Sequence, residues 1–151
     1  MAGIPVPPLG ACNLVMEADV EQLFVHNTSK SEGVGFRVKQ RPAAQRTLES
    51  LCVHVIQQPG ERFYPRLLIV YSVARNPADG KAAFRLNKTR LASRQTELHG
   101  PGDEAFAVDY AAYMRKGAQT ISMSLMTKRP ANDVNKSIRF LAELAAERAW
   151  G

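Results

Sequence analysis

Long hydrophobic runs, metal-binding motifs and nucleotide-binding motifs are all missing from this sequence. No apolar stretch approaches the roughly 20 residues that a membrane-spanning helix needs. The three histidines, His26, His54 and His99, have no zinc-ligand spacing. No P-loop, dinucleotide fingerprint or nucleophile elbow occurs. We therefore expect no transmembrane segment, no metal and no cofactor.

The composition that remains is ordinary for a folded protein. The 151 residues are 45% hydrophobic and 23% charged. A chain of this length forms one domain that buries about 70% of its unfolded surface. We expect a single domain over 12–151, preceded by a flexible segment over 1–11. The excess of 20 basic over 14 acidic residues gives a net charge of +6, which favours acidic partners without naming one.

Cysteine is scarce, because Cys12 and Cys52 are the only two in the chain. Neither belongs to a metal or redox motif, and an even pair of this kind suggests a structural disulfide and an oxidising, extracytoplasmic compartment. Two alternatives stay open. The cysteines could be free thiols in a cytosolic protein, or Cys52 could act as a nucleophile with His54, which alternation places on the same strand face.

The N-terminus carries two conflicting indications of export. Residues 1–11 have no basic region and their prolines break an apolar helix, so we expect no signal peptide in this chain. Residues 9–12 (LGAC) nevertheless look like a lipobox, in which Cys12 would carry lipid. Lipidation would consume the sulfur that a disulfide with Cys52 requires.

Apolar periodicity predicts three helices and an antiparallel sheet, an α+β fold with N-terminal, middle and C-terminal helices packed on the sheet. Strands are predicted over 36–39, 48–57, 66–74, 104–109, 111–115 and 119–127. Helices are predicted over 13–25, from an N-cap at Asn76 with Pro77 as the first helical residue, and from a cap at Asn132 or Asp133 to Trp150. The middle helix is predicted to bury a stripe of Ala78, Ala82, Ala83, Leu86 and Ala92, and the last helix a stripe of Val134, Ile138, Leu141, Ala142, Ala145 and Ala149. The polar stretch 26–35 is predicted to be a loop. Strands 48–57 and 66–74 are apolar on both faces, which predicts a central place in the sheet with both sides buried.

Several segments resemble one family. Residues 12–20 (CNLVMEADV) are similar to the opening of a domain found in secreted bacterial proteins, often lipoproteins and abundant in actinobacteria. Residues 100–106 (GPGDEAF), 114–117 (MRKG) and the closing helix over 141–148 also match its pattern. The resemblance implies a sandwich near the PsbP-like and mycobacterial sensor-domain class, a disulfide joining Cys12 to Cys52, and no established enzymatic role. The basic character of 28–49 departs from the pattern.

Basic residues form two groups in the sequence. Arg37, Lys39, Arg41 and Arg46 lie close together, and Lys81, Arg85 and Lys88 share one face of the middle helix. A solvated cationic surface is the ordinary interpretation. The functional interpretation is a contact surface for an anionic envelope component or an acidic protein. Aromatic residues are not interleaved with either group, so we expect no specific nucleic-acid binding.

The leading hypothesis is a non-catalytic extracytoplasmic domain that binds a protein partner or an envelope component. One alternative is an immunity or inhibitor protein against a secreted toxin or enzyme. Another is a small thiol hydrolase using Cys52 and His54, and a cytosolic nucleic-acid binder comes last. Asp103 and Glu104 are adjacent carboxylates that point apart, so we assign them to turn formation. The sequence defines neither the partner nor the oligomeric state.

Overall fold

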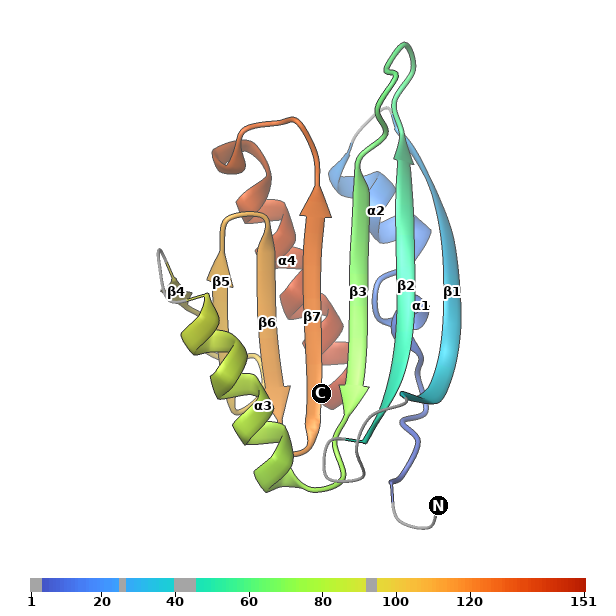
Figure 1. Ribbon diagram of the computed structural model, residues 1–151. Coiled ribbons are helices and arrows are strands. Elements are labelled where there is room, and N and C mark those ends of the chain that lie inside the picture. The colour runs from blue at the N-terminus through green and yellow to red at the C-terminus, as the bar shows by residue number, and fades with distance from the viewer. Residues whose placement is uncertain (1–3, 25–26, 40–45, 92–94) are drawn as a thin grey trace.

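An antiparallel sheet of seven strands with four helices makes up the computed structural model, which describes residues 4–24, 27–39, 46–91 and 95–151 (Figure 1). The strand order is β1-β2-β3-β7-β6-β5-β4. All neighbouring strands pair antiparallel. The predicted α+β class is therefore confirmed. No helix in the described part of the chain is long and apolar enough to cross a bilayer.

The elements follow the predicted order. Along the chain they are α1 (Ala11–Leu14), α2 (Glu17–Leu23), β1 (Thr28–Lys39), β2 (Thr47–Gln57), β3 (Arg66–Val73), α3 (Pro77–Arg90), β4 (Thr96–Glu97), β5 (Glu104–Val108), β6 (Ala111–Lys116), β7 (Gln119–Met126) and α4 (Ala131–Trp150). Five of the predicted strands and the last helix agree with these bounds within one or two residues, because their apolar periodicity is strong.

The N-terminal third departs from the prediction in two places. The single helix expected over 13–25 is two short helices, α1 and α2, with the Asp19 carboxylate accepting a hydrogen bond from the Met16 N–H at 2.8 Å. The loop expected over 26–35 was wrong: from Thr28 on, these residues form β1, and the predicted strand 36–39 is only its end. β1 is an edge strand with mostly exposed side chains, so its sequence shows no apolar alternation.

One face of the sheet carries the hydrophobic core. Helices α1, α2 and α4 lie against it, and α4 buries its predicted stripe except at Ala149, which is half-buried. The largest fully buried core side chains include Leu14, Ile56, Leu67, Ile69, Tyr71, Met114, Ile121, Met123, Ile138 and Leu141. Arg148 of α4 donates to the Leu14 carbonyl and to the Asp19 carboxylate, where the bond to Oδ1 is 3.0 Å long. These bonds join α4 to α1 and α2.

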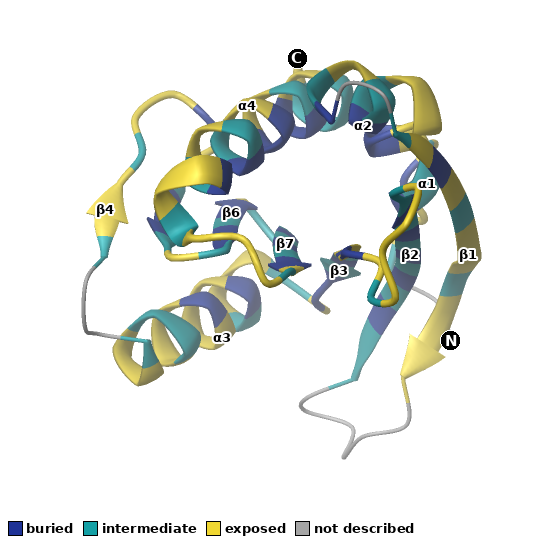
Figure 2. Ribbon diagram, turned by 90° about the horizontal axis from the view of Figure 1, so that it is seen from above, coloured by how far each residue is buried: buried dark blue, intermediate teal, exposed yellow. Residues whose placement is uncertain are grey.

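Of the helices in the described ranges, only α3 lies on the opposite face, over β6 and β7 (Figure 2). Asn76 caps it as predicted, accepting the Asp79 N–H at 2.8 Å, and Pro77 is the first helical residue. Phe84 packs edge-on against Phe106 at 5.4 Å between ring centroids. Gly80 approaches the Gly117–Ala118 backbone so closely that a β-carbon would lie 3.0 Å from it.

The predicted buried stripe of α3 was wrong. Ala78, Ala82, Ala83 and Leu86 are exposed, and Leu86 retains 63% of its accessible surface. Ala92 lies outside the described residues. The buried residues of α3 are Gly80 and Phe84, because an aromatic ring and a close backbone approach orient the helix more strongly than alanines do.

Candidate functional site

The two cysteines form the predicted disulfide. It joins α1 to β2 with a Cα–Cα distance of 5.0 Å, and no free cysteine is present in the described chain. Cys52 is fully buried, and Cys12 is half-buried beside it. The bridge indicates an oxidising environment. With its sulfur bonded to Cys12, Cys52 has no thiolate to act as a nucleophile in this state.

His54 is a buried structural residue next to the bridge. Its Nε2 lies 2.8 Å from the Val15 carbonyl oxygen and 3.6 Å from the Cys52 Sγ, and its Nδ1 lies 3.4 Å from the Ser29 hydroxyl. Nε2 therefore carries the proton and donates to Val15. Burial lowers the pKa of His54, so the imidazole is neutral near pH 7.

Ser50 provides a second link between α1 and the sheet. Its hydroxyl accepts the Ala11 N–H at 2.9 Å and donates to the Val34 carbonyl at 2.8 Å. The Val34 carbonyl lies where the β1–β2 register shifts, between Val34 and Arg37. The hydroxyl of the buried Ser50 thus provides a hydrogen-bond partner for an N–H at the start of α1 and for a carbonyl at the irregular part of the edge strand.

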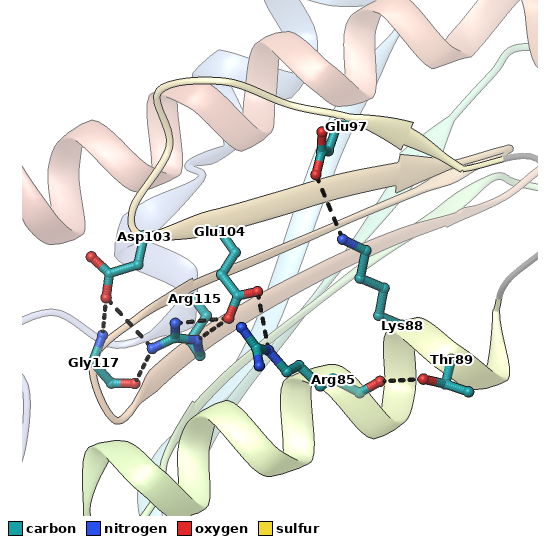
Figure 3. A network of polar contacts seen from close by, with 8 residues as sticks. All are labelled: Arg85, Lys88, Thr89, Glu97, Asp103, Glu104, Arg115 and Gly117. Atoms are coloured by element: carbon teal, nitrogen blue, oxygen red, sulfur yellow. Dashed lines mark hydrogen bonds and ion pairs between the residues drawn. The ribbon is translucent and has the colours of Figure 1, made fainter.

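The predicted basic residues do not form one surface. Arg37 and Lys39 lie on β1, where Lys39 pairs with Glu49 at 3.5 Å, and Arg46 precedes β2. Arg41 lies outside the described residues. The second group lies across the sheet on α3, where Arg85 pairs with Glu104 at 3.7 Å and Lys88 pairs with Glu97 at 3.8 Å (Figure 3). Much of the expected cationic surface is therefore neutralised.

The segment 100–106 has a structural explanation that its sequence did not reveal. Arg115 of β6, with a side chain only 8% exposed, donates from Nε to Glu104 at 2.7 Å and from Nη1 to the Gly117 carbonyl at 3.0 Å (Figure 3). Asp103 accepts the Gly117 N–H at 2.8 Å. Gly102, with φ +66°, approaches the Arg115 backbone too closely for a β-carbon. This arrangement, the Arg115 clamp, fastens the loop before β5 to the β6–β7 turn.

The feature that suggests a function is a sheet face that no described element covers. On the α3 side of the sheet, β2 presents Leu51, Val53 and Val55, and β3 presents Leu68 and Val70. Val34 of β1 is the cross-strand neighbour of Leu51 and extends the same surface. We call these six residues the open face. Val34 is 43% exposed and Leu68 is 37% exposed.

The open face corrects the prediction that β2 and β3 are buried on both sides. In Figure 1, α1, α2 and α4 lie behind the sheet and α3 crosses in front of its other half, so no helix or strand of the described residues lies in front of β1, β2 and β3. The view from above shows the same gap beside α3 (Figure 2). Four residues of the open face are half-buried, and only their neighbours in the sheet cover them: Leu51, Val53 and Val55 of β2 and Val70 of β3.

A groove borders the open face along α3. Its floor carries Ser72, Thr120 and Ser122, its wall includes Leu86 and Arg90, and its volume is about 340 Å³. In the described part of the chain none of the three floor hydroxyls makes a hydrogen bond within the protein. Tyr113 lies deeper, stacked on Phe106 at 4.9 Å, and burial raises its pKa.

Positive charge surrounds the open face. Lys30 and Arg66 lie beside Val55 in the strand register, and Arg37 lies beyond Val34. Within the described residues these three side chains, and Arg90 on α3, form no ion pair. Two carboxylates lie on the same side of the sheet, Glu32 and Glu49, and Glu49 is paired with Lys39. The surface is therefore apolar in the middle and mainly cationic at its margins.

The fold and this surface define a disulfide-linked α+β domain with one sheet face covered and half of the other face open. Comparisons with family models, with curated proteins and with solved structures find no match for this chain. Among the residues that the structure describes, no cluster of histidine, cysteine, aspartate or glutamate is arranged to hold a metal ion.

Proposed function

We propose that this protein is a non-catalytic extracytoplasmic binding domain that docks a protein partner on its open face. One observation supports this most strongly: β2 and β3 carry aliphatic side chains on a face that β7 lines with hydroxyls. Antiparallel strands that face water normally alternate apolar with polar residues, as β7 does with Thr120, Ser122 and Ser124. A local pattern that conflicts with its surroundings is typical of a functional surface.

Two further observations support the remaining parts of the proposal. The Cys12–Cys52 bridge favours a compartment in which disulfides persist, in keeping with the resemblance to domains of secreted bacterial proteins. The bonding of Cys52 and His54 favours a non-catalytic role. Cys52 is oxidised in the disulfide, and His54 donates its Nε2 proton to a backbone carbonyl. A thiol hydrolase would need both groups free.

Photo-crosslinking in the source cells tests the proposal. A benzophenone amino acid at position 68 probes the open face, and the same amino acid at position 140 is the control, because Phe140 is an exposed apolar residue of α4, 53% accessible. We expect a discrete protein adduct from position 68 and none from position 140. We also expect maleimide labelling of the denatured, unreduced protein to find both cysteines blocked.

Other outcomes would contradict the proposal or redirect it. Reactive thiols in the cellular protein would contradict the extracytoplasmic assignment. Equal labelling from positions 68 and 140, or no adduct from either, would contradict docking on the open face. An adduct with a secreted toxin or enzyme would favour the inhibitor alternative over an envelope partner.

A further inference from the structure

We infer that the segment docked on the open face is an acidic amphipathic helix of the partner, seated parallel to α3; this inference rests on the proposed function. The arrangement of helices on the two faces supports it. On the core face, α1 and α2 contact β1 and β2, while α4 contacts β6 and β7. On the opposite face, α3 contacts β6 and β7, and no described helix occupies the place over β1–β3 (Figure 2).

The dimensions of the vacant place suit one helix. Three strands spaced about 4.8 Å apart span roughly 10 Å between their outer axes, and a helix with its side chains is about 10–12 Å wide. Along the strands, the stretch from Glu49 to Val55 is about 20 Å long at the usual rise per residue. A helix covers that length with about 13 residues, close to the 14 residues of α3.

The edge of the sheet is a poorer docking site than its face. A partner strand would have to pair with β1, the outermost strand. The outward N–H of Ser31 already donates to the Glu17 carboxylate at 3.0 Å, and the register shifts between Val34 and Arg37. Charged residues, irregular pairing and local capping are the devices that keep an edge strand from recruiting another strand. The open face has no such protection.

The charges around the open face specify the flanks of the helix. Lys30 and Arg66 lie at one end, Arg37 lies at the other, and Arg90 projects from α3 on the groove side. A helix whose apolar stripe rests on Leu51, Val53, Leu68 and Val70 brings its flanking residues over these cations. Glutamate or aspartate at the flanks complements them, whereas lysine or arginine is repelled. The inferred ligand therefore has an apolar stripe bordered by carboxylates.

Two synthetic peptides test the inference directly. Both contain about four helical turns with leucine at the i, i+3, i+4 and i+7 positions. One carries glutamate at the flanking positions and the other carries lysine, and circular dichroism verifies equal helicity. Titration of the isotope-labelled protein, followed by amide chemical shifts, gives the site and the affinity together. We expect the acidic peptide to shift the amides of Val53, Leu68 and Val70 saturably, and the basic peptide to bind at least tenfold more weakly.

Matched variants separate the apolar term from the charge term. Leu68→Glu should weaken binding of the acidic peptide by at least tenfold, while Phe140→Glu, at a still more exposed apolar site on α4, should not change it. Arg66→Glu should lower the affinity for the acidic peptide and raise the affinity for the basic one. Lys136→Glu places the same change in charge on the exposed surface of α4 and should alter neither affinity.

The results also distinguish the inference from the proposed function. Shifts that map outside the open face, or equal affinities for the two peptides, would overturn the inferred helix. If position 68 crosslinks in cells to a loop or a strand of the partner, the binding function holds and the helix is wrong. If neither peptide binds the open face and position 68 gives no adduct, both proposals fail.

Discussion

Gly33 of β1 lies so close to the disulfide that a β-carbon on this residue would overlap the Sγ of Cys12. The same β-carbon would lie 2.9 Å from the Leu51 carbonyl oxygen. The φ angle of Gly33 is not in the left-handed region, so conformational freedom does not explain the glycine. No side chain fits at position 33, because the disulfide between α1 and β2 packs directly against the edge strand.

Gly33→Ala should therefore destabilise the protein by about 1–3 kcal/mol, the usual cost of inserting an atom into a closely packed site. Urea unfolding followed by circular dichroism measures it. Gly35→Ala, two residues along the same strand, is the control, because its β-carbon would have nothing within 4 Å. Equal losses for the two variants would show that the disulfide does not impose the glycine.

Removal of the disulfide should cost more. Cys12→Ala with Cys52→Ala opens a loop with a sequence separation of 40. The chain-entropy model predicts a loss of about 3–4 kcal/mol for a loop of that size. In this double variant Gly33→Ala should cost less than in the wild type, since the Sγ that it meets is gone. An unchanged cost of Gly33→Ala would mean that the Leu51 carbonyl alone excludes the β-carbon.

Stability should fall in mild acid because of His54. Burial holds its pKa below the ordinary value in the folded state, so the unfolded chain binds a proton first as the pH falls below about 6.5. The contribution of His54 is complete above that pH and is lost progressively toward its lower folded pKa. Urea midpoints between pH 7.5 and 5 should show the decline. His54→Gln should flatten it, whereas substitution of the exposed His99 should not. If His54→Gln unfolds, the ring-proton titration of His54 in the wild type should still give a midpoint below 6.5.

A second decline should follow in stronger acid because of Asp19. The hydrogen bonds from Arg148 lower the pKa of Asp19, so its stabilising effect is complete above about pH 4 and is lost as the pH falls through the folded value. Arg148→Met should reduce this decline and leave the His54 decline in place.

Strong periodicity explains which elements were predictable from the sequence. β7 alternates apolar and polar residues, and α4 repeats its apolar stripe over 20 residues, so both were predicted almost to the residue. β1 was missed because its serines, glycines and charges are typical of a loop, and only pairing with β2 makes it a strand. The rotation of α3 was wrong because its alanines carry little information, whereas Phe84 is oriented by Phe106.

The candidate site was predictable only in part. The Cys12–Cys52 pair was found because no other cysteine competes for it. The Arg115 clamp was missed because Arg115 lies on β6, whereas its carboxylate partners Asp103 and Glu104 lie at the start of β5, and only the pairing of β5 with β6 brings them to Arg115. The apolar character of both sides of β2 was read correctly, but which side a helix covers depends on the path of the whole chain.

The Arg115 clamp should contribute far more stability than an exposed ion pair. Arg115→Met leaves Glu104, 20% exposed, without its buried partner, and removes the donor to the Gly117 carbonyl. Loss of one member of a buried pair costs about 3 kcal/mol. Arg75→Met is the matched control, since Arg75 pairs with Asp79 at 3.0 Å but is 52% exposed, and it should cost about 0.5 kcal/mol. Arg115→Lys should fall between them, because lysine keeps the charge and loses the planar fork. Equal urea midpoints for Arg115→Met and Arg75→Met would contradict the structural role of the clamp.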